Sequence, residues 1–205
     1  MKNAAKNGSD MKVRQAHPSD EAAISYICVC TADGGGDARS LYSRLDLPGL
    51  IWAVPYLHFN PAHCFVLERD NSVVGYIVTA ADTRAYEQWQ HARWWPQVNE
   101  GLRDFTPETE ADQNFLDALA QNQQPAPDYA DQYPAHLHIN LLPEAQGGGF
   151  GQKLMHAALD QLRADGVSGI HLGVNRNNVR AIGFYKAMGF EQVADEGAPI
   201  FARAL

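Results

Sequence analysis

A strand, a glycine-rich turn, a helix and a second strand follow one another between residues 134 and 174, and this run limits the fold more than any other segment. Residues 134–142 alternate apolar and polar side chains, which predicts a strand. Four glycines lie within 147–151. The helix after them has apolar residues at the spacing of one buried face: Leu154, Met155, Ala158, Leu159 and Leu162. With a second apolar run at 170–174, the segment predicts a β-α-β unit.

Antiparallel strands are expected before and after this unit. Residues 64–68 and 73–79 are rich in β-branched and aromatic side chains, and the turn between them predicts a hairpin. Further strands are predicted at 11–16, 190–196 and 199–204, and helices at 20–31, from the loop 33–37 to about Leu47, at 48–58 and at 177–188. The expected fold class is α/β, with a mixed, mostly antiparallel sheet flanked by helices.

Residues 82–133 differ in composition from the segments around them. They hold many aromatic residues, glutamines and prolines, with helical spacing over 83–93 and 108–121. We interpret the segment as an insertion rather than a second domain, because it is short and has few aliphatic core formers. Residues 11–205 are then expected to form one domain, and the polar residues 1–10 to be disordered.

The charge balance narrows the choice of partners. The chain has 205 residues, with 16 Lys and Arg against 24 Asp and Glu, which gives a formal net charge of −8. Nucleic acid is an unfavourable partner, because binding phosphates requires clustered Lys and Arg. A cationic amine or a neutral small molecule suits this chain better.

Neither a membrane segment nor a disulfide framework is expected. The sequence has no run of about 18 apolar residues, so no membrane partner is predicted. The N-terminal residues lack the apolar region of a signal peptide, which favours a cytoplasmic location. Cys28, Cys30 and Cys64 have no CxxC spacing and suit reduced thiols.

The glycine-rich turn is suited to binding a phosphate or a diphosphate. Glycines let the backbone approach a ligand closely, and the helix that follows offers unpaired N–H groups and the positive end of its dipole. A P-loop is excluded, because Gln152 and Leu154 stand where GxxxxGK[ST] requires Gly and then Ser or Thr. The dinucleotide pattern GxGxxG fails at the same two positions. The other interpretation of the turn is a tight structural connection.

Two motifs, in order, resemble those of the GNAT superfamily of acyl-CoA-dependent N-acetyltransferases. Gln146-x-x-Gly149-x-Gly151 is similar to the family's (Arg/Gln)-x-x-Gly-x-(Gly/Ala) diphosphate loop. Downstream, Asn178-x-x-Ala181-x-x-Phe184-Tyr185, followed by Gly189-Phe190, is similar to a second family motif. More narrowly, residues 133–139 are similar to the acetyltransferase-like domain of O-GlcNAcases and its stand-alone bacterial relatives. That O-GlcNAcase domain has lost the glycine loop, whereas this chain retains it.

The resemblance implies a GNAT-like sheet whose central parallel strands, about 135–142 and 169–174, splay apart so that the pantetheine of acetyl-CoA inserts between them. Tyr185 would protonate or hydrogen-bond the departing thiolate, and backbone amides near 139–141 would polarise the thioester carbonyl. No metal is implied. The residues expected to bind the cofactor are Ile139, Asn140, Leu141, Gln146, Gly147, Gly148, Gly149, Phe150, Gly151, Gln152, Asn178, Phe184 and Tyr185.

A base must take a proton from the attacking ammonium, and the sequence offers four candidates: His138, His136, Asp82 and Glu144. Alternation places His136, His138 and Asn140 on one face of the predicted strand. We choose His138 as the catalytic base, because a neutral imidazole accepts a proton at physiological pH. A structural histidine is the other interpretation, and no third ligand completes a zinc site with the His-x-His pair.

Aromatic residues gather in and before the insertion, and three interpretations stay open. They could line an acceptor groove, form a homodimer contact, or pack the insertion onto the sheet as a satellite cluster. The residues are Trp52, Tyr56, Tyr86, Trp89, Trp94 and Trp95.

The resemblance thus predicts an acetyl-CoA-dependent N-acetyltransferase that transfers the acetyl group directly to an amine, without a covalent enzyme intermediate. The acceptor is either a small amine or a peptide or protein lysine. The alternative is a non-catalytic acyl-CoA-binding or protein-interaction domain on the same scaffold.

Overall fold

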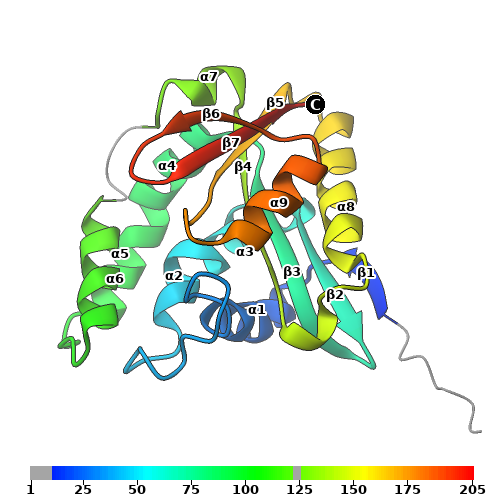
Figure 1. Cartoon of the computed structure of the whole chain (residues 1–205). Coiled ribbons are helices and arrows are strands. Elements are labelled where there is room, and N and C mark those ends of the chain that lie inside the picture. The colour runs from blue at the N-terminus through cyan, green and yellow to red at the C-terminus, as the bar shows by residue number, and fades with distance from the viewer. Residues whose placement is uncertain (1–10, 122–125) are drawn as a thin grey trace, which may run out of the picture.

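The computed structural model describes residues 11–121 and 126–205, so the segment expected to be disordered, 1–10, lies outside the described residues. Within the described residues, seven strands form one sheet in the order β1-β2-β3-β4-β5-β7-β6 (Figure 1). The strands are β1 (Met11–Gln15), β2 (Cys64–Arg69), β3 (Ser72–Ala80), β4 (Ala135–Leu141), β5 (Gly169–Gly173), β6 (Glu191–Asp195) and β7 (Pro199–Ala204).

Only one neighbouring pair in this described sheet, β4 and β5, is parallel. It pairs at Ala135↔Ile170 and His136↔His171, and the two strands then separate. In Figure 1 the lower part of β5 leads away from β4, and a gap opens between them. The expected fold class, a mostly antiparallel sheet with a splayed central parallel pair, is confirmed.

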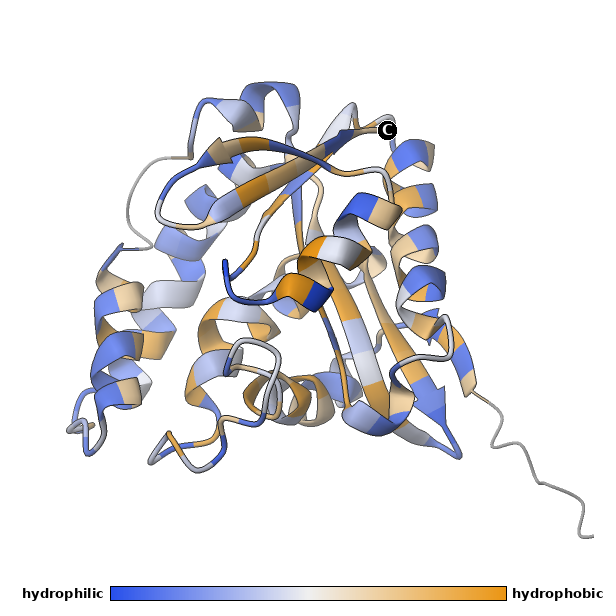
Figure 2. Ribbon diagram, in the orientation of Figure 1, coloured by the Kyte–Doolittle hydropathy of each residue, from blue (hydrophilic) through white to orange (hydrophobic). Residues whose placement is uncertain are grey.

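Helix α8 (Phe150–Ala164) covers one face of the first half of the sheet. Its buried stripe, Leu154 to Leu162, packs on strand residues such as Ile77 and Leu137, because these residues alternate toward that face. Figure 2 shows this division, with apolar colour along the strands and hydrophilic colour on the outer side of α8. Helix α9 (Val179–Ala187) adds Tyr185 to the same core.

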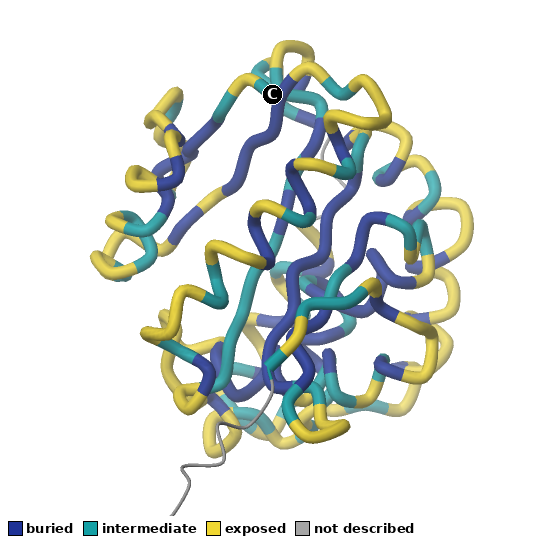
Figure 3. The backbone as a smooth tube through the Cα atoms, turned by 90° about the vertical axis from the view of Figure 1, so that its right-hand side faces the viewer, coloured by how far each residue is buried: buried dark blue, intermediate teal, exposed yellow. Residues whose placement is uncertain are grey.

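Helices α1 (Glu21–Val29) and α3 (Val54–Phe59) lie on the opposite face, and α2 (Leu47–Trp52) packs against both of them. Ile24 and Tyr56 pack there against Tyr76 of β3. The central strands are therefore buried between two helical layers, as the dark tube in Figure 3 shows. Because helices cover both faces of the sheet, we expect a ligand site where β4 and β5 separate or at the ends of the strands.

Between β3 and β4 the chain forms α4 (Thr83–Trp89), a π-helical stretch (Gln90–Trp94), α5 (Trp95–Gly101), α6 (Glu110–Gln121) and α7 (Tyr129–Gln132). Helices α5 and α6 lie side by side at one edge of the molecule (Figure 1). Trp94, Trp95 and Phe115 form a separate apolar cluster with Leu47 and Ile51 of α2. This segment thus attaches to the sheet through α2 and α4.

The helix expected from the glycine loop to about Leu47 is wrong. Residues 37–46 form turns and bends, and helix begins only at Leu47. Side chains occupy backbone groups that a helix would use: Asp37 accepts from the Arg39 N–H at 3.0 Å, and Asp112 of α6 accepts from the Ser43 N–H at 3.0 Å. The hairpin of β2 and β3 is confirmed.

Two further properties follow from the side chains. Cys28, Cys30 and Cys64 are free and buried, and burial raises the pKa of Cys28 and of Cys64 to about 12. The thiols of Cys28 and Cys64 are therefore poor nucleophiles at neutral pH. Within residues 11–121 and 126–205, no helix has the length and apolar character needed to cross a membrane.

Candidate acyl-CoA and acceptor site

A cavity of about 640 Å³ opens where β4 and β5 separate. Its lining joins the end of β4, the glycine-rich turn and the first part of α9. The predicted cofactor residues that line it are Ile139, Asn140, Leu141, Gln146, Gly147, Gly149, Gly151, Gln152, Asn178, Phe184 and Tyr185. Gly148, Phe150 and His138 do not line this cavity, although each is next in sequence to residues that do.

The glycine-rich turn offers a row of free donors. Within the described residues, the backbone N–H groups of 147–152 have no hydrogen-bond partner. Gly149 is the N-cap of α8 and has the left-handed conformation, with φ of 76°. No side chain at this position caps the first N–H groups of the helix. At Gly147, with φ of 81°, an added Cβ would have open space around it. These N–H groups at a helix N-terminus form a site for an anion.

Phe150 has a structural role instead. Its ring lies so close to Gly148 that a Cβ there would stand 2.7 Å from Phe150 Cε2. On the other side, Lys153 Nζ lies 4.8 Å from the centre of the ring. Phe150 also packs against the core beneath α8, so its side chain connects the glycine-rich turn to that core.

Gln146 connects three parts of the site. Its Nε2 donates to Leu141 O at 2.8 Å, and its Oε1 accepts from Nη1 of Arg180 on α9. Sequence reasoning missed Arg180, which also lines the cavity. The side chain of Gln146 is therefore engaged with protein groups, and it holds a cation beside the free N–H groups.

Asn178 caps α9: its Oδ1 accepts from the Ala181 N–H at 3.0 Å. Its other atom, Nδ2, lies 3.1 Å from the place where a Cβ on Gly35 would stand. The loop after α1 thus reaches the start of α9. Ala181, part of the second motif but not among the expected cofactor residues, also lines the cavity. Cavity-lining residues that the sequence did not identify are Thr31, Gly34, Gly35 and Arg180. The three consecutive glycines at 34–36 were the available signal for the loop.

Tyr185 is buried, and burial raises its pKa. The residue lines the cavity. A raised pKa keeps the phenol protonated at neutral pH, so the hydroxyl carries a proton that it can donate to a departing anion. Phe184 beside it closes the wall near Gly151.

Asn140 lies on the face of β4 turned away from α8. Its Nδ2 donates to the hydroxyl of the buried Tyr76 at 2.7 Å, which leaves Oδ1 as an acceptor beside the cavity. Ile139 and Leu141 point to the other face and pack on the α8 core. The alternation predicted for this strand is confirmed at these positions.

The four candidate bases separate into two groups. Asp82 is the N-cap of α4 and accepts from the Ala85 N–H at 3.0 Å, and Glu144 lies 3.5 Å from Arg69 on the surface. Neither lines the cavity. His136 and His138 are partly buried on β4, and burial lowers the pKa of His138 to about 4 and that of His136 well below its usual value.

The aromatic residues divide in the same way. Trp94 and Trp95 are buried in the cluster with α2 and α6, and Trp94 Nε1 donates to Leu50 O at 2.8 Å. This arrangement fits the satellite-cluster interpretation. Tyr56 and Tyr86 stack at 4.5 Å between ring centres, and both rings meet the edge of His136.

No group of three or more His, Cys, Asp or Glu residues within the described parts of the chain is arranged to hold a metal ion.

A model of the Acetyltransferase (GNAT) family matches residues 36–190. The chain belongs to this family. The prediction of a GNAT-type acetyltransferase is thus confirmed at the level of the family. The family model covers the residues that line the cavity except Thr31, Gly34 and Gly35.

Curated relatives of this GNAT protein match only through part of their own length. The protein O-GlcNAcase of Rattus norvegicus is 24% identical over 191 residues, which is 91% of this chain and 21% of that protein. A mycothiol acetyltransferase of Frankia casuarinae is 29% identical over 132 residues, 64% of this chain and 28% of that protein. The chain therefore spans less than a third of the length of either relative.

Solved structures show the same fold. The crystal structure of SsHAT has 33% sequence identity and a TM-score of 0.89, covering 95% of this chain and 98% of that chain. The structure of yncA from Salmonella typhimurium with its cofactor acetyl-CoA has a TM-score of 0.58 at 17% identity, covering 95% and 94%. The second likeness concerns the fold alone.

Proposed function

We propose that this protein is an acetyl-CoA-dependent N-acetyltransferase that transfers an acetyl group directly to an amine. One observation carries the proposal: the unpaired N–H groups of residues 147–152, at the N-terminus of α8, border a cavity that reaches the split between β4 and β5. Family membership and the acetyl-CoA in the structure of yncA, which has the same fold, support it.

The residues present fit the cofactor. Gly147, Gly149, Gly151 and Gln152 would donate backbone N–H bonds to a diphosphate, and Arg180 would add a positive charge. The edge of β4 that faces the split has no strand partner beyond His136 among the described residues, so pantetheine can pair with it as an added strand. Asn178, Phe184 and Tyr185 would line the inner end.

When bound, acetyl-CoA supplies the acetyl group as a thioester. Backbone amides near residues 139–141 would donate to the carbonyl oxygen and stabilise its negative charge, a contribution on the order of 3 kcal/mol per donor. Tyr185 would donate its proton toward the departing sulfur. His138, on the face of β4 turned away from α8, would accept the proton that the ammonium of the acceptor must lose.

A second candidate is a non-catalytic acyl-CoA-binding domain. The observation in its favour is the low basicity of His138, whose pKa of about 4 makes it a weak proton acceptor in the free protein. An ammonium bound beside this imidazole would not raise the pKa of His138, because a nearby positive charge disfavours the protonated imidazole. The two candidates therefore differ in turnover and not in cofactor affinity.

Calorimetric titration with acetyl-CoA tests the shared part of both candidates. We expect binding, and a protein that binds no acetyl-CoA at millimolar concentration would refute the enzyme and the binding domain alike. Thiol release across a panel of small amines and lysine peptides then tests transfer. Binding without release from any acceptor would leave the non-catalytic domain as the function.

Tyr185→Phe tests the proposed acid. We expect kcat to fall by about a hundredfold, because the departing thiolate loses its proton donor, while the acetyl-CoA affinity stays within a factor of two. Tyr42→Phe, at the edge of the cluster around α2 and α6, is the matched control and should change neither quantity. Unchanged turnover in Tyr185→Phe would contradict the role.

A further inference from the structure

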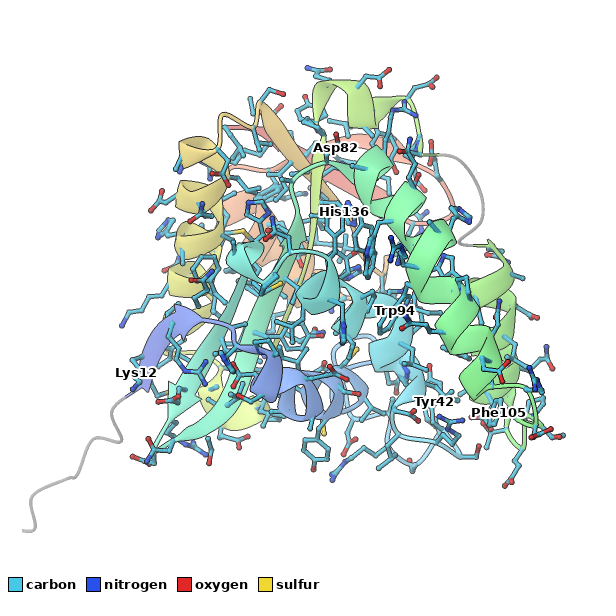
Figure 4. All side chains as sticks on the ribbon, turned by 180° about the vertical axis from the view of Figure 1, so that it is seen from behind. Lys12, Tyr42, Asp82, Trp94, Phe105 and His136 are labelled. Carbon is cyan, nitrogen blue, oxygen red and sulfur yellow. The ribbon has the colours of Figure 1, made fainter. Side chains whose placement is uncertain are left out.

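Three histidines meet where β4 and β5 stop pairing. His136 and His171 are opposite each other in the last parallel pair, with 5.7 Å between ring centres, and His138 follows two residues later on the same face of β4. Figure 4 shows His136 between the central strands and α4. This position is at the inner end of the split, on the face turned away from α8.

Thr83 of α4 determines which nitrogen of His136 carries the proton. Its hydroxyl lies 2.7 Å from Pro134 O and 2.7 Å from His136 Nδ1. A carbonyl oxygen can only accept, so the single hydroxyl hydrogen is donated to Pro134 O. The hydroxyl oxygen must then accept from His136, which places the proton on Nδ1 and leaves a lone pair on Nε2.

His171 has the same tautomer for the same reason. Its Nδ1 lies 2.7 Å from Tyr133 O, which can only accept, so Nδ1 is protonated and Nε2 carries a lone pair. Burial lowers the pKa of His171 as well as that of His136. The two imidazoles are therefore neutral at pH 7, and each has one free acceptor.

These free nitrogens have no protein partner but are open to solvent. Among the described residues, the sealed polar side-chain atoms without a hydrogen bond are Tyr86 Oη and Trp95 Nε1. His136 Nε2, His171 Nε2 and both nitrogens of His138 also lack a partner and are absent from that sealed pair, so they border accessible space. The buried Tyr86, 3% exposed, places its unpaired hydroxyl on the ring that meets His136 edge-on.

The groups around His136 come from four elements. They are His138 on its own strand, His171 on β5, Tyr56 on α3, and Thr83 and Tyr86 on α4. None of these neighbours is an acid or a permanent cation. Imidazole lone pairs between aromatic rings accept N–H donors, whereas a carboxylate or phosphate head group would find few donors there.

We propose that the acceptor amine is seated against the Nε2 lone pair of His136, and that Thr83 is the positioning residue that fixes this lone pair. The inference rests on the proposed function. After the ammonium has lost one proton to His138, the neutral primary amine keeps two N–H bonds and one lone pair. Donation of one N–H to His136 Nε2 turns the lone pair of the nitrogen away from the histidine. Thr83 touches neither substrate and acts through His136 alone.

The tautomer can be measured directly by long-range ¹⁵N–¹H correlation spectra of histidine-labelled protein. We expect His136 to be protonated at Nδ1 in the wild type and in Thr83→Ser, and to become a mixture of tautomers in Thr83→Val. The assignment comes from His136→Asn, whose spectrum lacks these signals. Protonation at Nε2 in the wild type would overturn the proposal without reference to activity.

Kinetic measurements on the same variants test whether the acceptor amine binds at Nε2 of His136. We expect Thr83→Val to lower kcat/KM for the amine by about tenfold, with an increase in its KM, and Thr83→Ser to restore it within a factor of two. His136→Asn retains an N–H for Thr83 but removes Nε2, and should lower kcat/KM by about a hundredfold. Should Thr83→Val fail to fold, the kcat/KM values of Thr83→Ser and His136→Asn still test whether the amine binds at His136.

Thr79→Val is the matched control. Thr79 is also a buried threonine whose hydroxyl donates to a carbonyl, His63 O at 2.8 Å, but it contacts no histidine ring by that hydroxyl. It should lose stability and keep its amine KM. Acetyl-CoA titrations of every variant separate the two failures: a wild type without acetyl-CoA binding or turnover refutes the proposed function, whereas turnover unchanged in His136→Asn refutes only the seat.

Discussion

Arg180 is the one charged side chain among the described residues that line the cavity. The family loop accepts either Arg or Gln at the first position of its motif, and this chain has the neutral Gln146. Because Gln146 accepts a hydrogen bond from Arg180, a cation from α9 stands next to the loop that lacks one. The proposed diphosphate site would thus draw on two helices, α8 for the N–H groups and α9 for the charge.

Arg180→Gln should weaken acetyl-CoA binding by about tenfold, measured by calorimetry. The variant removes one charge-assisted contact to the diphosphate, and a tenfold change corresponds to about 1.4 kcal/mol, the lower end for an exposed ionic hydrogen bond. The loss should shrink at high salt, because exposed charges are screened.

The control for this variant is Arg176→Gln. Arg176 lies four residues earlier, pairs with Asp195 at 2.7 Å and does not line the cavity, so its removal should leave the affinity unchanged. Acetyl-pantetheine, which has no diphosphate, should bind the wild type and Arg180→Gln equally. A loss of affinity for acetyl-pantetheine would show that Arg180 acts elsewhere.

Most residues that line the cavity could be predicted from the sequence because they lie in two short motifs. Gln146 to Gln152 and Asn178 to Tyr185 are each close in sequence, and a resemblance transfers them together. The acceptor half had no such signal. Thr83 and His136 are 53 positions apart, and only the packing of α4 against β4 brings the hydroxyl to the ring. No periodicity in either segment records that contact.

At the scale of elements, the start of α8 decides the direction of the donors. Gly149 has φ of 76° and ψ of 3°, and this left-handed residue turns the chain from β4 into the helix so that the first N–H groups face the cavity. The nearest atom to an added Cβ, Gln152 Oε1, would be 3.9 Å away. A side chain at this position is therefore unfavourable because of the left-handed backbone conformation, and not because it would clash with neighbouring atoms.

Gly149→Ala should lower the free energy of unfolding by about 1–2 kcal/mol, the cost of a left-handed conformation for a residue with a Cβ. It should also weaken acetyl-CoA binding, because relief of the strain would rotate the N–H groups. Urea unfolding and calorimetry measure the two effects.

Gly183→Ala gives the opposite sign and serves as the control. Gly183 lies inside α9, and a Cβ there would meet nothing within 4 Å. Alanine should raise the free energy of unfolding by up to about 1 kcal/mol through helix propensity, with no change in affinity. Equal stability of Gly149→Ala and the wild type would contradict the account of the turn.

The elements themselves were predictable where a pattern is local. The alternation of β4, the stripe of α8 and the hairpin of β2 and β3 were all recognisable, since each depends on neighbours in sequence. The turns at 37–46 were not, because Ser43 is held by Asp112 from α6, which is 69 positions away. The point at which β4 and β5 separate is likewise a property of the sheet and its helices together.

At the scale of the whole molecule, neutral imidazoles at the centre contrast with ion pairs at the edge. Arg14 pairs with Asp20 and Glu68 beside β1, and Asp165 pairs with His63 at the end of α8. Arg14 lowers the pKa of Asp20, His63 lowers that of Asp165, and Lys12 together with Arg14 lowers that of Glu68. The central histidines are shifted downward by burial instead. The two sets of groups therefore make stability depend on pH in different ranges.

The stability of this protein should fall as the pH is lowered from about 6.5 toward 4. His138 has a pKa of about 4 in the folded state and about 6.5 when unfolded, so between these values the unfolded chain binds a proton that the folded chain does not. Its contribution is complete above pH 6.5 and is lost on acidification. At pH 5 the loss from His138 alone is about 2 kcal/mol, and His136 and His171 act in the same direction.

Urea unfolding between pH 4.5 and 7 measures this slope, because carboxylates with lowered pKa values lose their contribution at lower pH, as the pH falls below their unfolded values of about 4. His138→Gln should show a smaller fall in the free energy of unfolding between pH 7 and 5 than the wild type. His156→Gln removes an exposed histidine of α8 and is the matched control. An identical slope in the wild type and His138→Gln would mean that His138 has the same pKa in the folded and the unfolded protein, and would contradict its lowered pKa in the folded state.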